Sequence, residues 1–294
     1  MPTRLALCAS LTLALLAAPA SALAADVVVP RSVAGSTTVP AGESRTLTLH
    51  CPATAVALNA AVTHRGAGVT VRRSIPGVAP GDWRFRLSAA VGARSRDVRA
   101  VLRCVRLAVP AGISGARLVV STHRSPIFVI PAGSFVAAQI GCQAGFVSTG
   151  YALDQGAPRS DVGIAAAIPT ANGWNFSLEN TGASPARARF TARCLKRVVS
   201  GRREGASTSM TFGVTRPDFS NRVEPGPGRR FSHSCRRSEF STATGSVVDP
   251  AEDIELSGSH PTGSSGGRWA FTRAHAGDRL RSSLVCLSRR TRFG

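Results

Sequence analysis

Six of the seven cysteines recur at nearly regular intervals, and this spacing restricts the fold more than any other feature of the sequence. They are Cys51, Cys104, Cys142, Cys194, Cys235 and Cys286. The two cysteines of successive pairs are 53, 52 and 51 positions apart, and the next pair begins 38 and 41 positions after the previous one ends. An internal period of this length is typical of tandem copies of one domain.

Other residues recur in register with the cysteines. A glycine lies nine residues before the first cysteine of each pair, at Gly42, Gly133 and Gly226. All three tryptophans stand in a W-x-F motif, 32, 32 and 34 residues after that cysteine. We therefore predict three domains, at 26–110, 116–199 and 208–294.

Alternation of apolar and polar residues predicts the type of fold. In 186–194, A-R-A-R-F-T-A-R-C, apolar residues and the cysteine occupy every second position. Such a period is typical of a half-buried strand with its cysteine facing inward. Turn residues recur about every 8–12 residues, and no sustained helical period is present. The sequence predicts an all-β chain of three tandem antiparallel β-sandwich domains.

Six cysteines allow 15 disulfide pairings, and the repetition favours one disulfide within each copy. Each bond would close a loop of about 50 residues, which stabilises a small domain by about 4 kcal/mol in the chain-entropy model. No Cys-x-x-Cys or Cys/His pair has zinc-ligand spacing. We therefore expect no metal and no cofactor.

The W-x-F motif has two interpretations. Residues two apart on a strand share one face, so the motif predicts either core packing beside the disulfide or an exposed aromatic platform for sugars or bases. One motif for each small core favours packing. The predicted core residues are Trp83, Phe85, Trp174, Phe176, Trp269 and Phe271.

Two resemblances follow from these motifs. The order Cys…Trp…Cys resembles that of immunoglobulin domains, although the tryptophan lies farther from its first cysteine here. This resemblance implies an immunoglobulin-like β-sandwich architecture. The pattern Cys…Gly-Trp-x-Phe…Cys resembles repeats in functionally uncharacterised secreted proteins of high-GC Gram-positive bacteria, and it implies export and a β fold.

The N-terminal residues predict export. Arg4 is followed by an apolar run and by small residues in A-x-A order, which is typical of a secretory signal peptide at 1–25. No later segment is apolar for long enough to span a bilayer. We expect a secreted, extracellular or cell-envelope-associated protein.

The charge balance indicates a class of partner. The chain has 36 Lys and Arg residues against 16 Asp and Glu, for a net charge of +20. Such an excess favours an anionic cell-wall polymer or polysaccharide, with nucleic acid bound only non-specifically. The alternative is a solvated surface that serves solubility.

Arginines on the predicted strands form the candidate binding site. One lies five residues before the second cysteine of each pair, and strand parity places it, with its neighbours, on the outward face. If the copies stacked in a row, these faces would form a discontinuous basic stripe. The alternative is solvated strand faces that discourage aggregation. The candidates are Arg99, Arg103, Arg187, Arg189, Arg193, Arg279 and Arg281.

Two further motifs are only weak indications of a functional site. Gly263–Gly267 matches the G-x-S-x-G nucleophile motif around Ser265, but the required strand-to-helix setting is not predicted there. The acidic cluster at 249–255 lacks EF-hand spacing. We therefore expect its carboxylates to form ion pairs with arginine side chains and not to bind calcium. We expect a non-enzymatic binding protein. The alternatives are a structural spacer without a specific ligand and a hydrolase that uses Ser265. The sequence leaves the oligomeric state open.

Overall fold

A computed structural model describes residues 28–64, 69–155, 162–222, 230–248, 255–262, 265–273, 279–288 and 293. This part of the chain is all-β and contains no helix, as the alternation predicted. The predicted signal peptide lies outside it.

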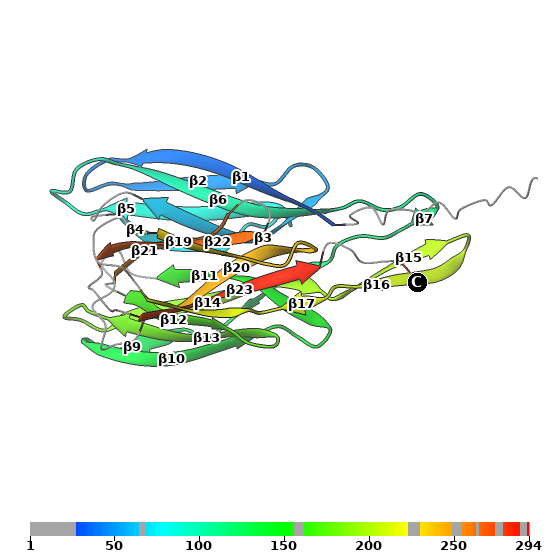
Figure 1. Cartoon of the computed structure of the whole chain (residues 1–294). Coiled ribbons are helices and arrows are strands. Elements are labelled where there is room, and N and C mark those ends of the chain that lie inside the picture. Colours follow the sequence, from blue (N-terminus) through cyan, green and yellow to red (C-terminus); the bar gives the residue numbers. More distant parts are fainter. Residues whose placement is uncertain are drawn as a thin grey trace, which may run out of the picture.

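Three consecutive segments contain strands in the same order (Figure 1). Segment 1 (28–107) comprises β1 (Val28–Val39), β2 (Ser44–His50), β3 (Ala55–His64), β4 (Val69–Pro76), β5 (Asp82–Ala89) and β6 (Arg96–Leu107). Segment 2 (120–196) comprises β8 (Val120–Arg124), β9 (Phe128–Ile130), β10 (Ser134–Gly141), β11 (Phe146–Gln155), β12 (Val162–Pro169), β13 (Gly173–Asn180) and β14 (Ala186–Lys196). Segment 3 (214–288) comprises β17 (Val214–Thr215), β18 (Asp218–Arg222), β19 (Arg230–Ser234), β20 (Glu239–Val248), β21 (Glu255–Thr262), β22 (Gly266–Arg273) and β23 (Arg279–Ser288).

Each segment forms two layers of antiparallel strands around an apolar core. In segment 1 the layers are β1-β6-β3 and β2-β5-β4, and Trp83, Phe85 and Cys104 are buried between them. The disulfides are Cys51–Cys104, Cys142–Cys194 and Cys235–Cys286. The predicted pairing is therefore confirmed. The fold is β-sandwich-like, and the division into three independent domains stays a prediction.

The repeated glycines have a conformational role. Gly42 and Gly133 lie in the turns before β2 and β10, with φ of +72° and +62°. This left-handed region costs glycine nothing but disfavours other residues. Gly226 lies outside the described residues.

The sheets continue from one segment into the next. The strand β4 of segment 1 pairs with β11 of segment 2 at Arg73 and Asp154, and the two side chains form an ion pair of 2.9 Å. The strand β12 pairs with β20 at Ala166 and Val247. The strand β21 of segment 3 lies beside β3 of segment 1. The three segments therefore form a closed ring instead of a row.

The strands β3, β11 and β20 meet where the segments converge. Each has a β-bulge at the matching position, and the extra residues Leu58, Thr149 and Thr242 are fully buried. The Thr149 hydroxyl donates a hydrogen bond of 3.3 Å to the Leu58 carbonyl oxygen. These bulges bring residues of different segments into direct contact.

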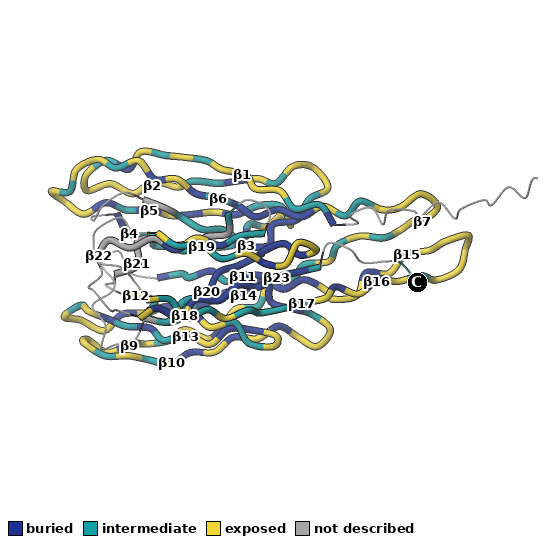
Figure 2. Tube along the Cα trace, in the orientation of Figure 1, coloured by how far each residue is buried: buried dark blue, intermediate teal, exposed yellow. Residues whose placement is uncertain are grey.

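One apolar cluster belongs to all three segments. It includes Val56, Val147 and Phe240, which lie five residues after the first cysteine of each pair, and Leu195 and Leu287, which directly follow the second. Figure 2 shows buried residues along the middle of the molecule and exposed residues on its outer strands. A shared core binds the segments into one body.

The connections between segments form a small sheet at one end. The strands β15 (Val198–Arg203) and β16 (Ala206–Thr211) form a hairpin, and β15 also pairs with β7 (Ile113–Ser114). The turn residues Glu204 and Gly205 have φ of +50° and +84°, the signs that a tight type I′ turn requires. The hairpin projects beyond the sandwiches (Figure 1).

Candidate anion-binding surface

Two of the seven candidate arginines do not face solvent. Arg103 and Arg193 are only 2% and 4% exposed, so the prediction that they line an outward basic stripe is wrong. The alternation along the strand was nevertheless predicted correctly, because the side chain of each arginine points to the face opposite that of the adjacent cysteine. The outer face of each strand is covered there by a neighbouring segment, segment 3 at Arg103 and segment 1 at Arg193.

Arg193 joins segment 2 to segment 1. Its Nε–H donates to the Ala57 carbonyl oxygen at 2.8 Å, and its Nη2 donates to the Pro80 carbonyl oxygen at 2.6 Å. Its Nη1 donates to the Thr122 hydroxyl at 3.0 Å. Burial lowers the pKa of Arg193 to about 10. The guanidinium stays charged at neutral pH and is held mainly by carbonyl oxygens, so it is not offered to a ligand.

Arg103 makes the corresponding connection from segment 1 to segment 3. Its Nη1 donates to the Ser32 hydroxyl at 2.9 Å, and its Nη2 donates to the Ser241 hydroxyl at 3.3 Å. Segment 3 has Val285 at the matching position, and this valine packs in the core cluster of segment 2. Each segment thus inserts the residue before its second cysteine into a neighbour.

The other five candidates do not form one row. Arg99, Arg187, Arg279 and Arg281 are exposed, and Arg189 is half-buried. Their strands β6, β14 and β23 belong to three different sheets. A linear polyanion therefore cannot follow all of them along one face.

A denser group of basic residues lies at the end that carries the hairpin, and we call it the basic end. All its members are exposed, and they occupy strand ends, connections and the hairpin. They are Arg106, Arg117, Lys196, Arg197, Arg202, Arg203, Arg236 and Arg237.

Backbone contacts place these connections together. Lys196 and Arg197 lie at the end of β14, directly before the hairpin. The Phe212 N–H donates to the Arg197 carbonyl oxygen at 3.0 Å, and the Ser288 N–H donates to the Gly213 carbonyl oxygen at 2.9 Å. Ser288 pairs in turn with Glu239, just after the Arg236–Arg237 turn. The hairpin base and this turn therefore share one end of the molecule.

The positive potential there acts on a neighbouring group. The pKa of Arg216 is lowered by burial and, secondarily, by the positive charge of Arg197. The sequence analysis missed the basic end because it followed strand faces. The doublets Arg202-Arg203 and Arg236-Arg237 were the available signal.

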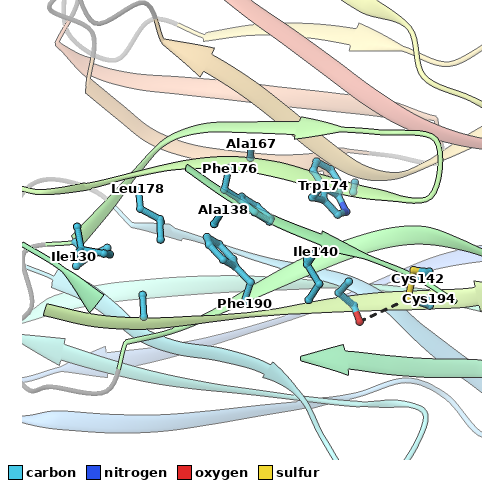
Figure 3. Close-up of a cluster of buried hydrophobic side chains, with 14 of the residues drawn as sticks. Ile130, Ala138, Ile140, Cys142, Ala167, Trp174, Phe176, Leu178, Phe190 and Cys194 are labelled. Carbon is cyan, nitrogen blue, oxygen red and sulfur yellow. Dashed lines mark hydrogen bonds between the residues drawn. A yellow bond between two sulfur atoms is a disulfide. The ribbon is translucent and has the colours of Figure 1, made fainter. Parts of the chain in front are cut away.

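The tryptophans form cores. Trp83, Trp174 and Trp269 are fully buried, which excludes an exposed platform at these three positions. Trp174 Nε1–H donates to the Ser148 hydroxyl at 2.7 Å, and Phe176 stacks on Phe190 with ring centroids 3.7 Å apart. Figure 3 shows Phe176 and Phe190 facing each other, in the core that also contains Trp174 and the Cys142–Cys194 disulfide. Phe85 and Phe176 are also buried, whereas the side chain of Phe271 lies outside the described residues.

The motifs considered for catalysis and calcium fall mostly outside the described part of the chain. Gly263, Ser264, His275 and residues 249–254 are among these. Ser265 is described, and its carbonyl oxygen accepts a hydrogen bond of 2.8 Å from the Cys235 N–H. This hydrogen bond holds the backbone of Ser265 beside Cys235. It involves the carbonyl group and gives no role to the Ser265 hydroxyl.

One group of potential metal ligands is explained by a covalent bond. Cys235, Glu239 and Cys286 lie close together, but the two sulfurs form a disulfide and cannot act as thiolates. Glu239 instead accepts hydrogen bonds from the Thr215 hydroxyl and the Arg236 N–H. This group is a structural junction.

The described residues include no helix long and apolar enough to cross a membrane. The three disulfides indicate an oxidising environment. No protein-family model matches the sequence, and no curated protein matches it.

Proposed function

We propose that the protein is secreted after removal of residues 1–25 and binds an anionic cell-envelope or extracellular polymer without catalysis. In this proposal the chain comprises three tandem β-sandwich domains of immunoglobulin-like architecture, locked into a ring. The binding surface is the basic end.

The gathering of exposed cations at one end carries this proposal. Four of them are consecutive doublets, Arg202-Arg203 on the hairpin and Arg236-Arg237 in a turn. Exposed acids are sparse at this end, where Glu204 occupies the hairpin tip and Glu239 is buried. Like charges held together on a rigid scaffold repel one another, and a polyanion relieves that repulsion while releasing its own counterions.

The shared core supports binding by one rigid unit. The cluster that includes Leu195, Val199, Met210 and Phe212 lies beneath the hairpin connections. Because these residues are buried, the connections are held in place. A preorganised cationic surface loses less conformational entropy on binding than a flexible tail would.

Co-sedimentation with isolated Gram-positive cell walls tests the proposal, with salt at about 0.05 M and about 0.5 M to vary screening. The variant replaces Arg202, Arg203, Arg236 and Arg237 by serine. A matched control replaces Arg99, Arg187, Arg279 and Arg281 by serine and so removes the same charge from the strand faces. We expect salt-sensitive binding that the first variant weakens at least tenfold and the control weakens much less.

Each other outcome has a defined meaning. Equal losses in both variants would contradict a localised site and leave binding by net charge alone. No binding at low salt would refute the function. The alternative of a structural spacer without a ligand would then be favoured, because the ring and its disulfides resist unfolding with no binding partner.

A further inference from the structure

The outer edges of the sheets differ in charge. Edge strands expose unpaired backbone N–H and C=O groups, and charged side chains on them discourage pairing with other chains. Five of the edge strands described here carry an exposed arginine. They are β1 with Arg31, β2 with Arg45, β8 with Arg124, β18 with Arg222 and β19 with Arg230.

Among the matching edge strands β2, β10 and β19, the strand β10 is the one that carries no charge. It ends the sheet β10-β13-β12-β20-β23-β17, and its residues, S-F-V-A-A-Q-I-G, include no charge. Relative to the following cysteine, Val136 and Ala137 occupy the positions of Arg45 on β2 and Arg230 on β19. The position that is basic on β2 and the position that is basic on β19 are therefore both apolar on β10.

The outer face beside β10 also lacks arginine. Its neighbour β13 presents Asn175, Ser177 and Glu179, which pair with Gln139, Ala137 and Phe135. In segment 1, Arg84 and Arg86 occupy the positions of Asn175 and Ser177 relative to the tryptophan. In a chain with a net charge of +20, this face is close to neutral.

Exposed apolar side chains adjoin the same edge. Phe135 on β10 is 54% exposed, and Val129 on β9 and Ile127 just before it are 58% and 50% exposed. A short turn at 131–133 joins β9 to β10. The edge of β10 therefore has both unpaired backbone groups and exposed apolar side chains with which another strand could interact.

We propose that two copies of the protein associate through antiparallel pairing of β10 with β10 of the second copy. Two-fold pairing brings each edge against itself, so every other edge of this set would place an arginine near its own symmetry mate. The β10 edge avoids that repulsion, and its uncharged strand is complementary to itself. An acidic extended partner would instead favour the arginine-bearing edges.

This inference does not depend on the proposed function, and sedimentation velocity of residues 26–294 over a concentration series tests it. The variant Ala137→Arg restores a charge at an exposed position of β10. The matched control Thr46→Arg adds the same charge at the corresponding exposed position of β2. We expect a concentration-dependent dimer in the unaltered protein and in the control. In Ala137→Arg we expect a dissociation constant at least tenfold higher.

Three results would overturn the proposal. The first is an unaltered protein that stays monomeric at every concentration. The second is an Ala137→Arg protein that dimerises as tightly as the unaltered chain. The third is an equal loss in Thr46→Arg, which would indicate general charge repulsion. Matching thermal melts of both variants would show that the fold is intact.

Discussion

The Arg193 Nε–H donates to the carbonyl oxygen of Ala57 across 2.8 Å, although the two residues lie 136 positions apart. The bond joins β14, which carries Cys194 of the second disulfide, to β3 of the preceding segment. It shows that the face of β14 opposite its own core is covered by protein. The segments are therefore coupled energetically as well as covalently.

Replacing Arg193 by alanine should destabilise the whole molecule. The change removes the guanidinium donor of the buried Ala57 carbonyl oxygen and one of the two donors of the Pro80 carbonyl oxygen, which also accepts from the Ala57 N–H. An unsatisfied buried polar group costs about 1–3 kcal/mol. We expect the free energy of unfolding to fall by about 2–4 kcal/mol in chemical denaturation.

The control for this change lies on the same strand. Arg187 is exposed on β14, so Arg187→Ala should alter the unfolding free energy by less than about 0.5 kcal/mol. Equal effects of the two substitutions would show that the contacts of Arg193 with segment 1 contribute nothing to stability.

The covalent frame and the strands could be predicted because they follow local rules. Alternation in 186–194 gives a strand whose cysteine faces inward, and the repeated interval pairs each cysteine with its neighbour. The fully buried tryptophans follow from the W-x-F motif in the same way. Each of these inferences needs only one segment.

The packing between segments follows no such local rule. Residues 190–195 are buried on both faces of β14, yet Arg193 looks like a solvent-facing residue in the sequence. The matching position holds arginine in segments 1 and 2 but valine in segment 3, so no single residue type at this position marks the interface. A run such as L-V-C-L at 284–287 hints at two-sided burial, but it does not identify the covering segment.

A second prediction concerns the junction between segments 2 and 3. A Cβ at Gly245 would lie 2.5 Å from the Ala167 carbonyl oxygen and 2.9 Å from Pro169 Cδ. Because β12 and β20 pair directly there, Gly245→Ala must separate the strands. We expect a loss of about 1–3 kcal/mol in unfolding free energy.

Gly163→Ala is the matched control for this junction. Gly163 lies on β12 and has open space where a Cβ would stand. Its replacement should leave the melting temperature nearly unchanged. A Gly245→Ala protein as stable as the Gly163→Ala protein would contradict a tight junction.

A third prediction concerns pH and His233 on β19. Its ring stacks on Phe219 with centroids 3.8 Å apart, and its Nε2–H donates to Asn221 Oδ1 at 2.7 Å. Burial lowers the pKa of His233 below its usual value of 6.5, so the unfolded chain binds the proton more readily. The contribution of neutral His233 to the free energy of unfolding is therefore complete above about pH 6.5. It is lost as the pH falls from 6.5 through the lower pKa of the folded state.

The melting temperature of the unaltered protein should therefore decline more steeply between about pH 7 and pH 5.5 than that of His233→Gln, which cannot titrate. Parallel declines in the two proteins would show that His233 does not couple protonation to folding.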